Sequence, residues 1–264
     1  MKTHFWLGGS VAAMLLSACA TVASDTSAPK WETIFDGETL TGWTPKISGQ
    51  ELGEDTGGIF RAENGALIIS YESYSKFSGE YGHLFFTKPM SDYRLRFSYA
   101  FGETQTPGGP GWAFMNSGVM VHSQSPETMR VDQSFPVSVE AQLLGKRDAT
   151  MARTTANVCT PGTHVVIDGE LTTQHCVNSQ TQAQLANTWT QFEMDVRSGV
   201  LIALRINGTE ALRLTDPVFD HSDPDVARLG LSGAVTRGYF ALQAESHPVR
   251  IRDIELMRLD PEGS

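Results

Sequence analysis

Short runs of alternating apolar and polar residues recur along the chain and are rich in β-branched and aromatic side chains. They predict strands at 66–70, 93–101, 117–123, 135–144, 164–169, 190–199, 201–208, 210–215, 238–247 and 249–259. Asn207-Gly208 between two such runs predicts a tight hairpin, and Asp168-Gly169 predicts a weaker one. Residues 179–189 predict a turn or two of helix at most. The pattern therefore favours an all-β fold, a two-sheet antiparallel β-sandwich or jelly roll.

Strand alternation also sorts the polar residues by face. In 135–144, Val139, Ala141 and Leu143 share one face, while Glu140 and Gln142 share the other. A polar outer face of an antiparallel sheet is common, and it is one explanation. A ligand-binding face is the other, and the alternation alone leaves both open.

Two further strands repeat this arrangement. In 239–247, alternation places Tyr239, Gln243, Glu245 and His247 on one face, and in 117–123 it places His122 on the polar face. No lysine accompanies these acid–base groups on any of the three strands. We therefore expect a shared site on the concave side of the sandwich.

The N-terminal residues predict export. Lys2 precedes a mostly apolar run, too short to span a bilayer, that ends in Leu16-Ser17-Ala18-Cys19. This pattern predicts a signal peptide over 1–18 with a bacterial lipobox, a lipid on Cys19 and a tether over 19–30. An ordinary signal peptide with a chance cysteine is the alternative. We expect a lipoprotein anchored in the membrane of the bacterial cell envelope, facing the periplasm or the exterior.

The net charge limits the classes of binding partner, and the length of the chain limits the number of domains. The formal net charge is −10, and removal of Lys2 with the signal peptide makes it −11. An acidic surface repels phosphate backbones, so we expect no nucleic-acid partner. The remainder suits one large β domain, which we assign to residues 31–264.

Two cysteines, Cys159 and Cys176, remain after Cys19 is assigned to lipid. An even pair in an exported chain favours a disulfide, worth about 3 kcal/mol for a loop of this length. Zinc bound by these cysteines with His164 and His175 is the alternative, although the usual Cys-x-x-Cys spacing is missing.

A Gly- and Pro-rich segment at 103–118 contains Trp112 and predicts a long loop. Loops on a rigid sandwich often carry binding residues.

Several blocks of the sequence resemble the 3-keto-disaccharide hydrolase family. They are IFDGETLTGW at 34–43, FRAENGALIIS at 60–70, NSGVMVHSQ at 116–124, FPVSVEAQLLG at 135–145 and GYFALQAESHPVRIRDIEL at 238–256. The resemblance runs from about residue 31 to 259. Residues 158–176 look like a subgroup insertion with two cysteines, which supports the disulfide. His122 departs from the family pattern, which often has Arg there, and Gly145-Lys146-Arg147-Asp148 replaces a Gly-rich turn.

The resemblance implies a concanavalin-like jelly roll that cleaves 3-keto-glycosides or 3-keto-disaccharides. A ketone at C3 acidifies the C2 proton, so a base can remove it, the glycosidic oxygen can leave C1 by β-elimination, and water can add back. This route needs no carboxylate pair at fixed separation, unlike ordinary glycosidases. The chain lacks the Glu-x-Asp-x-x-Glu spacing of jelly-roll β-glucanases.

Each candidate residue has an expected role in this chemistry. His247 or His122 suits a base near neutral pH, and Glu140 or Glu245 could orient it, act as acid or base, or bind a metal. Gln142 and Gln243 suit sugar hydroxyls, and Trp112 or Tyr239 could stack on a pyranose ring. A divalent metal held by His122, Glu140, Glu245 and His247 is a further candidate.

The remaining histidines, His83, His164, His175 and His221, are expected at the surface or in loops. Two other classes stay open: a non-catalytic carbohydrate-binding lipoprotein and a structural envelope lipoprotein.

Overall fold

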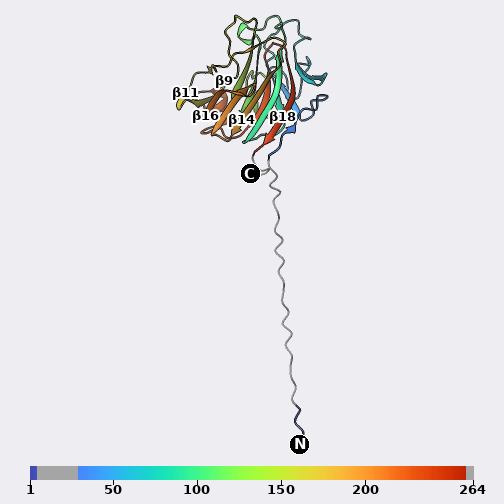
Figure 1. The fold of residues 1–264 in the computed structure, drawn as a ribbon, viewed down its shortest axis with the longest axis vertical. Helices are drawn as coiled ribbons and strands as arrows, with labels where there is room; N and C mark the ends of the chain where they lie inside the picture. The colour runs from blue at the N-terminus through green and yellow to red at the C-terminus, as the bar shows by residue number, and fades with distance from the viewer. Residues whose placement is uncertain (5–28, 260–264) are drawn as a thin grey trace.

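Two β-sheets stack to form a sandwich in the computed structural model, which describes residues 1–4 and 29–259 (Figure 1). The prediction of an all-β, two-sheet sandwich is confirmed. Cys19, most of the predicted signal peptide and most of the tether lie outside the described residues. Among the described residues, no helix is long and apolar enough to span a membrane.

The first sheet has ten strands and is antiparallel throughout. Its order is β11 (Glu170–Thr172), β10 (Thr163–Ile167), β16 (Thr209–Phe219), β15 (Leu201–Ile206), β14 (Thr190–Arg197), β6 (Tyr93–Phe101), β18 (Val249–Arg258), β4 (Ala66–Ile69) and β3 (Phe60–Glu63), with β1 (Glu32–Thr33) beside β18. The predicted hairpin lies between β15 and β16, where Asn207 and Gly208 have φ of 50° and 79°. Positive φ at both positions is what a type I′ turn requires.

The second sheet has eight strands and carries the site described below. Its order is β12 (Cys176–Val177), β9 (Asn157–Cys159), β8 (Val139–Lys146), β7 (Asn116–Ser123), β17 (Tyr239–Ala244), β5 (Gly82–Phe86) and β2 (Trp43–Ile47), with β13 (Gln184–Leu185) parallel to β8. Short helices η1 (Gly111–Ala113), η2 (Pro126–Thr128) and α1 (Pro224–Leu229) lie in the connections.

The core lies between the sheets, and alternation decides which residues reach it. Ala141 and Leu143 of β8 pack there with Phe240 and Leu242 of β17. Glu140 and Gln142 therefore project from the opposite, outer face of the eight-stranded sheet. This face holds the polar residues that the sequence singles out.

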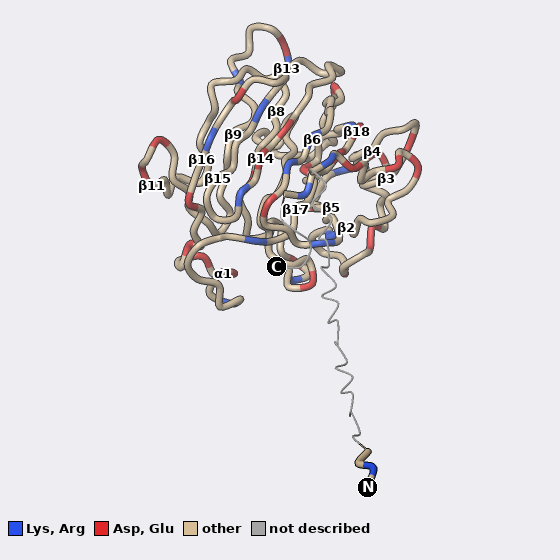
Figure 2. Tube along the Cα trace, turned by 60° about the horizontal axis from the view of Figure 1, so that its bottom comes forward, with Lys and Arg blue, Asp and Glu red and all other residues tan. Residues whose placement is uncertain are grey.

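In the ten-stranded sheet, basic residues of β6 lie beside strands β14 and β18, which carry both acidic and basic residues (Figure 2). Cross-strand ion pairs join Arg94 to Asp195 at 3.0 Å and Arg96 to Glu255 at 2.7 Å. This surface is ordinary solvated sheet, and its charges are largely paired with each other.

Several boundaries differ from the predictions. The strand expected from residue 135 begins at Val139, because Pro136 cannot donate to the ladder. Residues 179–189 contain β13 and no helix, whereas α1 is capped by Asp223 and ends at Gly230, with φ of 64°. An Asp N-cap, a Pro at the first helical position and a following Gly are the usual signs of a short helix.

Candidate active site

The strand register places Glu140 at the centre of the outer face of the eight-stranded sheet. It lies opposite Met120 of β7 on one side and Cys159 of β9 on the other. Gly118 gives it room, because a Cβ there would lie 2.8 Å from Glu140 Oε1. A glycine thus allows the carboxyl group to rest directly against the neighbouring strand.

A cavity of about 380 Å³ opens above this face. Its lining consists of Trp112, Asn116, Phe135, Glu140, Gln142, Cys159, Pro161, His175, Cys176 and Glu245. The structure therefore brings together four of the predicted site residues: Trp112, Glu140, Gln142 and Glu245. A cavity of this size with a few convergent polar groups is typical of small-molecule sites.

The two carboxyl groups in the cavity are buried, with Glu140 6% and Glu245 2% exposed. Burial raises the pKa of Glu140 to about 8, although the nearby Gln243 amide partly opposes this rise. Burial and then repulsion by Glu140 raise the pKa of Glu245 well above the usual carboxyl range. At neutral pH burial therefore favours the protonated form of both carboxyl groups.

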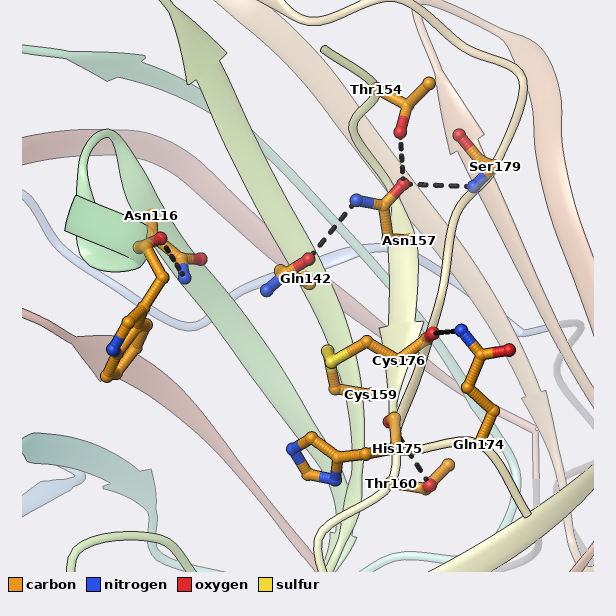
Figure 3. Close-up of a disulfide and its surroundings, with 11 residues drawn as sticks. Asn116, Gln142, Thr154, Asn157, Cys159, Thr160, Gln174, His175, Cys176 and Ser179 are labelled. Atoms are coloured by element: carbon orange, nitrogen blue, oxygen red, sulfur yellow. Dashed lines mark hydrogen bonds between the residues drawn. A yellow bond between two sulfur atoms is a disulfide. The ribbon is translucent and has the colours of Figure 1, made fainter. Parts of the chain in front are cut away.

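Amide groups at the rim of the cavity present one donor and one acceptor (Figure 3). Asn157 Nδ2 donates to Gln142 Oε1 at 3.2 Å, which leaves the Gln142 nitrogen pointing away from Asn157, toward the side of Asn116. Asn116 Nδ2 donates to the Trp112 carbonyl at 3.4 Å, and no described residue donates to Asn116 Oδ1. A sugar hydroxyl can donate to Asn116 and accept from Gln142.

Asn157 is itself fixed. Its Oδ1 accepts from Thr154 Oγ1 at 2.9 Å and from the Ser179 backbone N–H at 3.0 Å (Figure 3). These bonds hold the amide of Gln142 in one orientation.

Aromatic rings form another wall of the cavity. Trp112 stacks on Tyr81 with ring centroids 5.9 Å apart and an interplanar angle of 13°, and Tyr81 contacts Phe135 at 5.0 Å. Trp112 is 54% exposed, so its free face remains available. Exposed tryptophan faces of this kind suit stacking on the apolar face of a sugar ring.

The predicted disulfide between Cys159 and Cys176 is confirmed and forms part of the cavity wall (Figure 3). The two cysteines are directly opposite each other in the β9–β12 pair. Because the sulfurs are bonded to each other, the zinc alternative is wrong. A second cavity, of about 420 Å³, adjoins the first and shares Phe135, Pro161 and His175 with it.

His247 does not lie beside Glu140, contrary to the prediction from alternation. β17 ends at Ala244 and Ser246 has φ of 72°, so the alternation stops after Glu245. The His247 ring packs against Phe101 and Phe114, and its Nε2 donates to the Gly102 carbonyl at 3.0 Å. Burial lowers the pKa of His247.

His122 is also turned away. It has φ of 48° within a β-bulge between β7 and β17, and its ring faces the Met90 backbone and Asp92. Tyr239 does lie on the outer face, but it packs on Phe85 outside the cavity lining. Bulges reorient side chains in a way that simple alternation cannot predict.

The proposed metal ligands are consequently divided, since only Glu140 and Glu245 line the cavity. Among residues 1–4 and 29–259, no three His, Cys, Asp or Glu side chains are grouped as metal ligands would be. The arrangement does not fit the four-residue metal site, and the acid–base groups that remain in the cavity are Glu140 and Glu245.

Asn116, Phe135 and Tyr81 are lining or wall residues that the sequence interpretation missed. Asn116 could have been found, because it extends the alternation of Gly118 and Met120 by two positions. Phe135 and Tyr81 lie outside regular strands and give no such signal.

The sequence profile of a family described as the 3-keto-alpha-glucoside-1,2-lyase-like domain matches residues 30–257. This match confirms the resemblance seen in the sequence and supports a carbohydrate-related function. A comparison with curated protein sequences finds no match.

Solved structures share the fold at low sequence identity. Two proteins from Parabacteroides distasonis ATCC 8503, provisionally described as glycosyl hydrolases, are similar. One has 17% identity and a TM-score of 0.52 over 87% of this chain and 94% of its own. The other has 13% identity and a TM-score of 0.51 over 87% and 100%. A Bacillus subtilis protein with a galectin-like fold has 11% identity and a TM-score of 0.50 over 83% and 90%.

Proposed function

Because the chain belongs to the family of the 3-keto-alpha-glucoside-1,2-lyase-like domain, we propose that it cleaves 3-keto-glycosides by removing the C2 proton and eliminating the C1 substituent. The carboxyl pair Glu140 and Glu245 carries this proposal, because both lie in one cavity and both have raised pKa values. A base and an acid with pKa values near or above neutrality are what such a reaction needs.

Glu140 is the base in this proposal. With a pKa of about 8 it reaches the carboxylate form in mildly alkaline solution, and in that form it accepts the proton from C2. The electrons of the broken C–H bond form a C2–C3 double bond while negative charge collects on the C3 oxygen. The C3 carbonyl then re-forms, the enolate electrons make a C1–C2 double bond and the C1–O bond breaks. Glu245, whose pKa is raised well above the usual carboxyl range, donates its proton to the departing glycosidic oxygen.

Hydration then reverses these transfers. Water adds to C1 and gives a proton to the Glu245 carboxylate, while the protonated Glu140 returns a proton to C2. Both side chains end in their starting states, and the sum of the two halves is hydrolysis of the glycoside.

The other residues that line the cavity would bind the sugar. The free face of Trp112 would stack on one sugar ring, and Gln142 and Asn116 would bind its hydroxyls. The adjoining cavity offers space for a second unit, with His164 and Asp220, 3.6 Å apart, among its polar lining. A disaccharide-sized substrate would fill both.

Turnover of a 3-keto-disaccharide by the purified protein, followed by release of the reducing sugar, tests the proposal. Glu140→Gln should lower kcat by about a hundredfold or more. Glu193→Gln, which alters a carboxyl group paired with Arg205 on the other sheet, should leave it unchanged. The wild-type rate should rise with pH toward a plateau above about 8, as Glu140 loses its proton. Equal turnover by Glu140→Gln would refute the assignment.

Carbohydrate binding without catalysis is the second candidate, and the exposed Trp112 platform favours it. It predicts saturable binding of the sugar in calorimetry with no product, and equal affinity for the wild type and Glu140→Gln. A chelator added to the turnover assay tests the separate possibility of a divalent metal cofactor.

We further propose that the protein is a lipoprotein of the bacterial cell envelope, on the strength of the Leu16-Ser17-Ala18-Cys19 sequence. Incorporation of labelled palmitate into the wild type, and its loss in Cys19→Ala, would test this. Labelling that survives Cys19→Ala would contradict it.

A further inference from the structure

Two fully buried polar side chains lie beneath the cavity, and the mechanism above does not use them. Gln243 of β17 and His83 of β5 are direct register partners, both 0% exposed. Their position on the outer face follows from Leu242 and Leu84, which point into the core. Both ring nitrogens of His83 have no hydrogen-bond partner among the described residues, and the Gln243 amide interacts there with the Glu140 carboxyl group alone.

Such an arrangement is costly and unusual. Buried polar atoms in folded proteins are nearly always hydrogen-bonded, and those that are not call for an explanation. Here the two unpartnered ring nitrogens of His83 lie beside the Gln243 amide, since cross-strand partners have Cβ atoms about 5 Å apart. His83, which the sequence placed at the surface or in a loop, instead lies fully buried in β5, between β17 and the edge strand β2.

Phe135 separates this pair from the cavity. Its ring lies 6.0 Å from the His83 ring, and the same side chain lines the cavity. Phe135 precedes β8 in an irregular segment and is only partly buried. A sugar in the cavity would therefore reach His83 and Gln243 only if the Phe135 side chain moved aside.

The recess formed by His83 and Gln243 has one cation beside it, Lys46, on which Glu51 and Asp132 also act. Lys46 of β2 is the register partner of His83, and its Nζ donates to the carbonyls of Ile47, Gln50 and Val131 at 3.0–3.1 Å. Burial, aided by Lys46, lowers the pKa of His83 to about 3, so its imidazole is neutral. A neutral ring can donate one hydrogen bond without giving up its proton.

We propose that this recess receives the ketone oxygen of the sugar and stabilises the negative charge that collects there when the C2 proton is removed. This inference rests on the proposed function. The carboxyl pair and the recess lie on the same sheet face, and of the two N–H groups of Gln243 one can serve Glu140 while the other remains for the ketone. One N–H of His83 and one of Gln243 donate to the oxygen, and the Lys46 charge lies behind them. No further proton is transferred and no bond to the protein forms.

Apolar replacements of similar size at these positions should stabilise the free protein and impair catalysis, if the buried polar atoms form hydrogen bonds only with substrate. A purely structural role predicts the opposite effect on stability. The test therefore measures both properties in the same variants.

The experiment compares wild type, His83→Leu, Gln243→Met and the double variant, with His221→Leu as a control at an exposed loop histidine. Thermal unfolding without ligand is measured first, and kcat and KM for a 3-keto-disaccharide follow. We expect each single variant to unfold about 2–6 °C higher and to lose about a hundredfold in kcat with little change in KM. The double variant should lose less than the product of the two, because both groups serve one oxygen.

Unchanged kcat in both single variants, with an active wild type, would overturn the recess while leaving the proposed function intact. A lower unfolding temperature in both would also overturn it, since the atoms would then have partners in the free protein. No turnover by the wild type would instead refute the proposed function itself. If His83→Leu does not fold, Gln243→Met alone decides by the same two measurements.

Discussion

Replacing Glu140 by Gln should make the stability of the protein much less sensitive to alkaline pH. In the folded protein the pKa of Glu140 is about 8, against 4.5 for an unperturbed carboxyl group. Between these values the folded state holds a proton that the unfolded state releases. Stability from this group is therefore complete below about pH 4.5 and is lost as the pH rises to about 8.

The magnitude follows from the size of the shift. At about 1.4 kcal/mol per pKa unit, a rise from 4.5 to about 8 corresponds to at most about 5 kcal/mol. Glu140→Gln removes this loss, since an amide does not ionise. It also removes the charge that raises the pKa of Glu245, so the loss caused by that second carboxyl group shrinks as well.

Urea unfolding from pH 4.5 to 9 measures the effect as free energy extrapolated to water. The curves for wild type and Glu140→Gln should diverge as the pH rises, with the variant gaining several kcal/mol relative to wild type by pH 9. Glu193→Gln, on the other sheet, should run parallel to wild type. Parallel curves for Glu140→Gln and wild type would refute the reasoning about the buried carboxyl group.

Three further changes test the walls of the cavity. Replacing both Cys159 and Cys176 by Ser should lower the free energy of unfolding by about 3 kcal/mol, and added reductant should then have no effect on the variant. Gly118→Ala should slow turnover of a 3-keto-disaccharide about tenfold or more, because the new Cβ would lie 2.8 Å from Glu140 Oε1. Gly111→Ala is the control and should leave turnover unchanged, since its Cβ would meet nothing within 4 Å. Trp112→Ala should weaken sugar binding in calorimetry about tenfold, yet move the unfolding temperature little because the side chain is half exposed. Undiminished affinity in that variant would rule out the stacking platform.

The sequence predicted the strands well wherever one face is buried and the other polar. β6 was predicted at its observed bounds, and β7, β14 and β15 within one or two residues at each end. β5 was missed because its sequence, GHLFF, is short and mostly apolar and shows no alternation, and both of its faces are buried. Burial on both sides comes from the loops that cover the outer face, and these leave no local pattern in the strand itself.

The candidate site was predicted in part for a related reason. Glu140, Gln142 and Glu245 lie in regular or nearly regular strand, where side-chain parity holds. His122 and His247 were misplaced because a positive φ occurs at His122 and at Ser246, and each reverses the alternation locally. The residue type gives no signal at Ser246, whereas histidine is one of the types enriched at positive φ, which is a weak signal at His122.

Ser246, the residue at which alternation ends, connects two parts of the molecule. Its Oγ accepts from Gln105 Nε2 at 2.9 Å, and its carbonyl accepts from the Thr106 backbone N–H at 3.0 Å. Gly109 in the same loop has no side chain to block the bond between Gln105 and Ser246, whereas a Cβ there would lie 2.5 Å from Ser246 Oγ. The loop that carries Trp112 is thus tied to the residue next to Glu245. A transplant of this loop between relatives to alter sugar selectivity would therefore have to bring residue 246 along, because the loop and the acid share one attachment point.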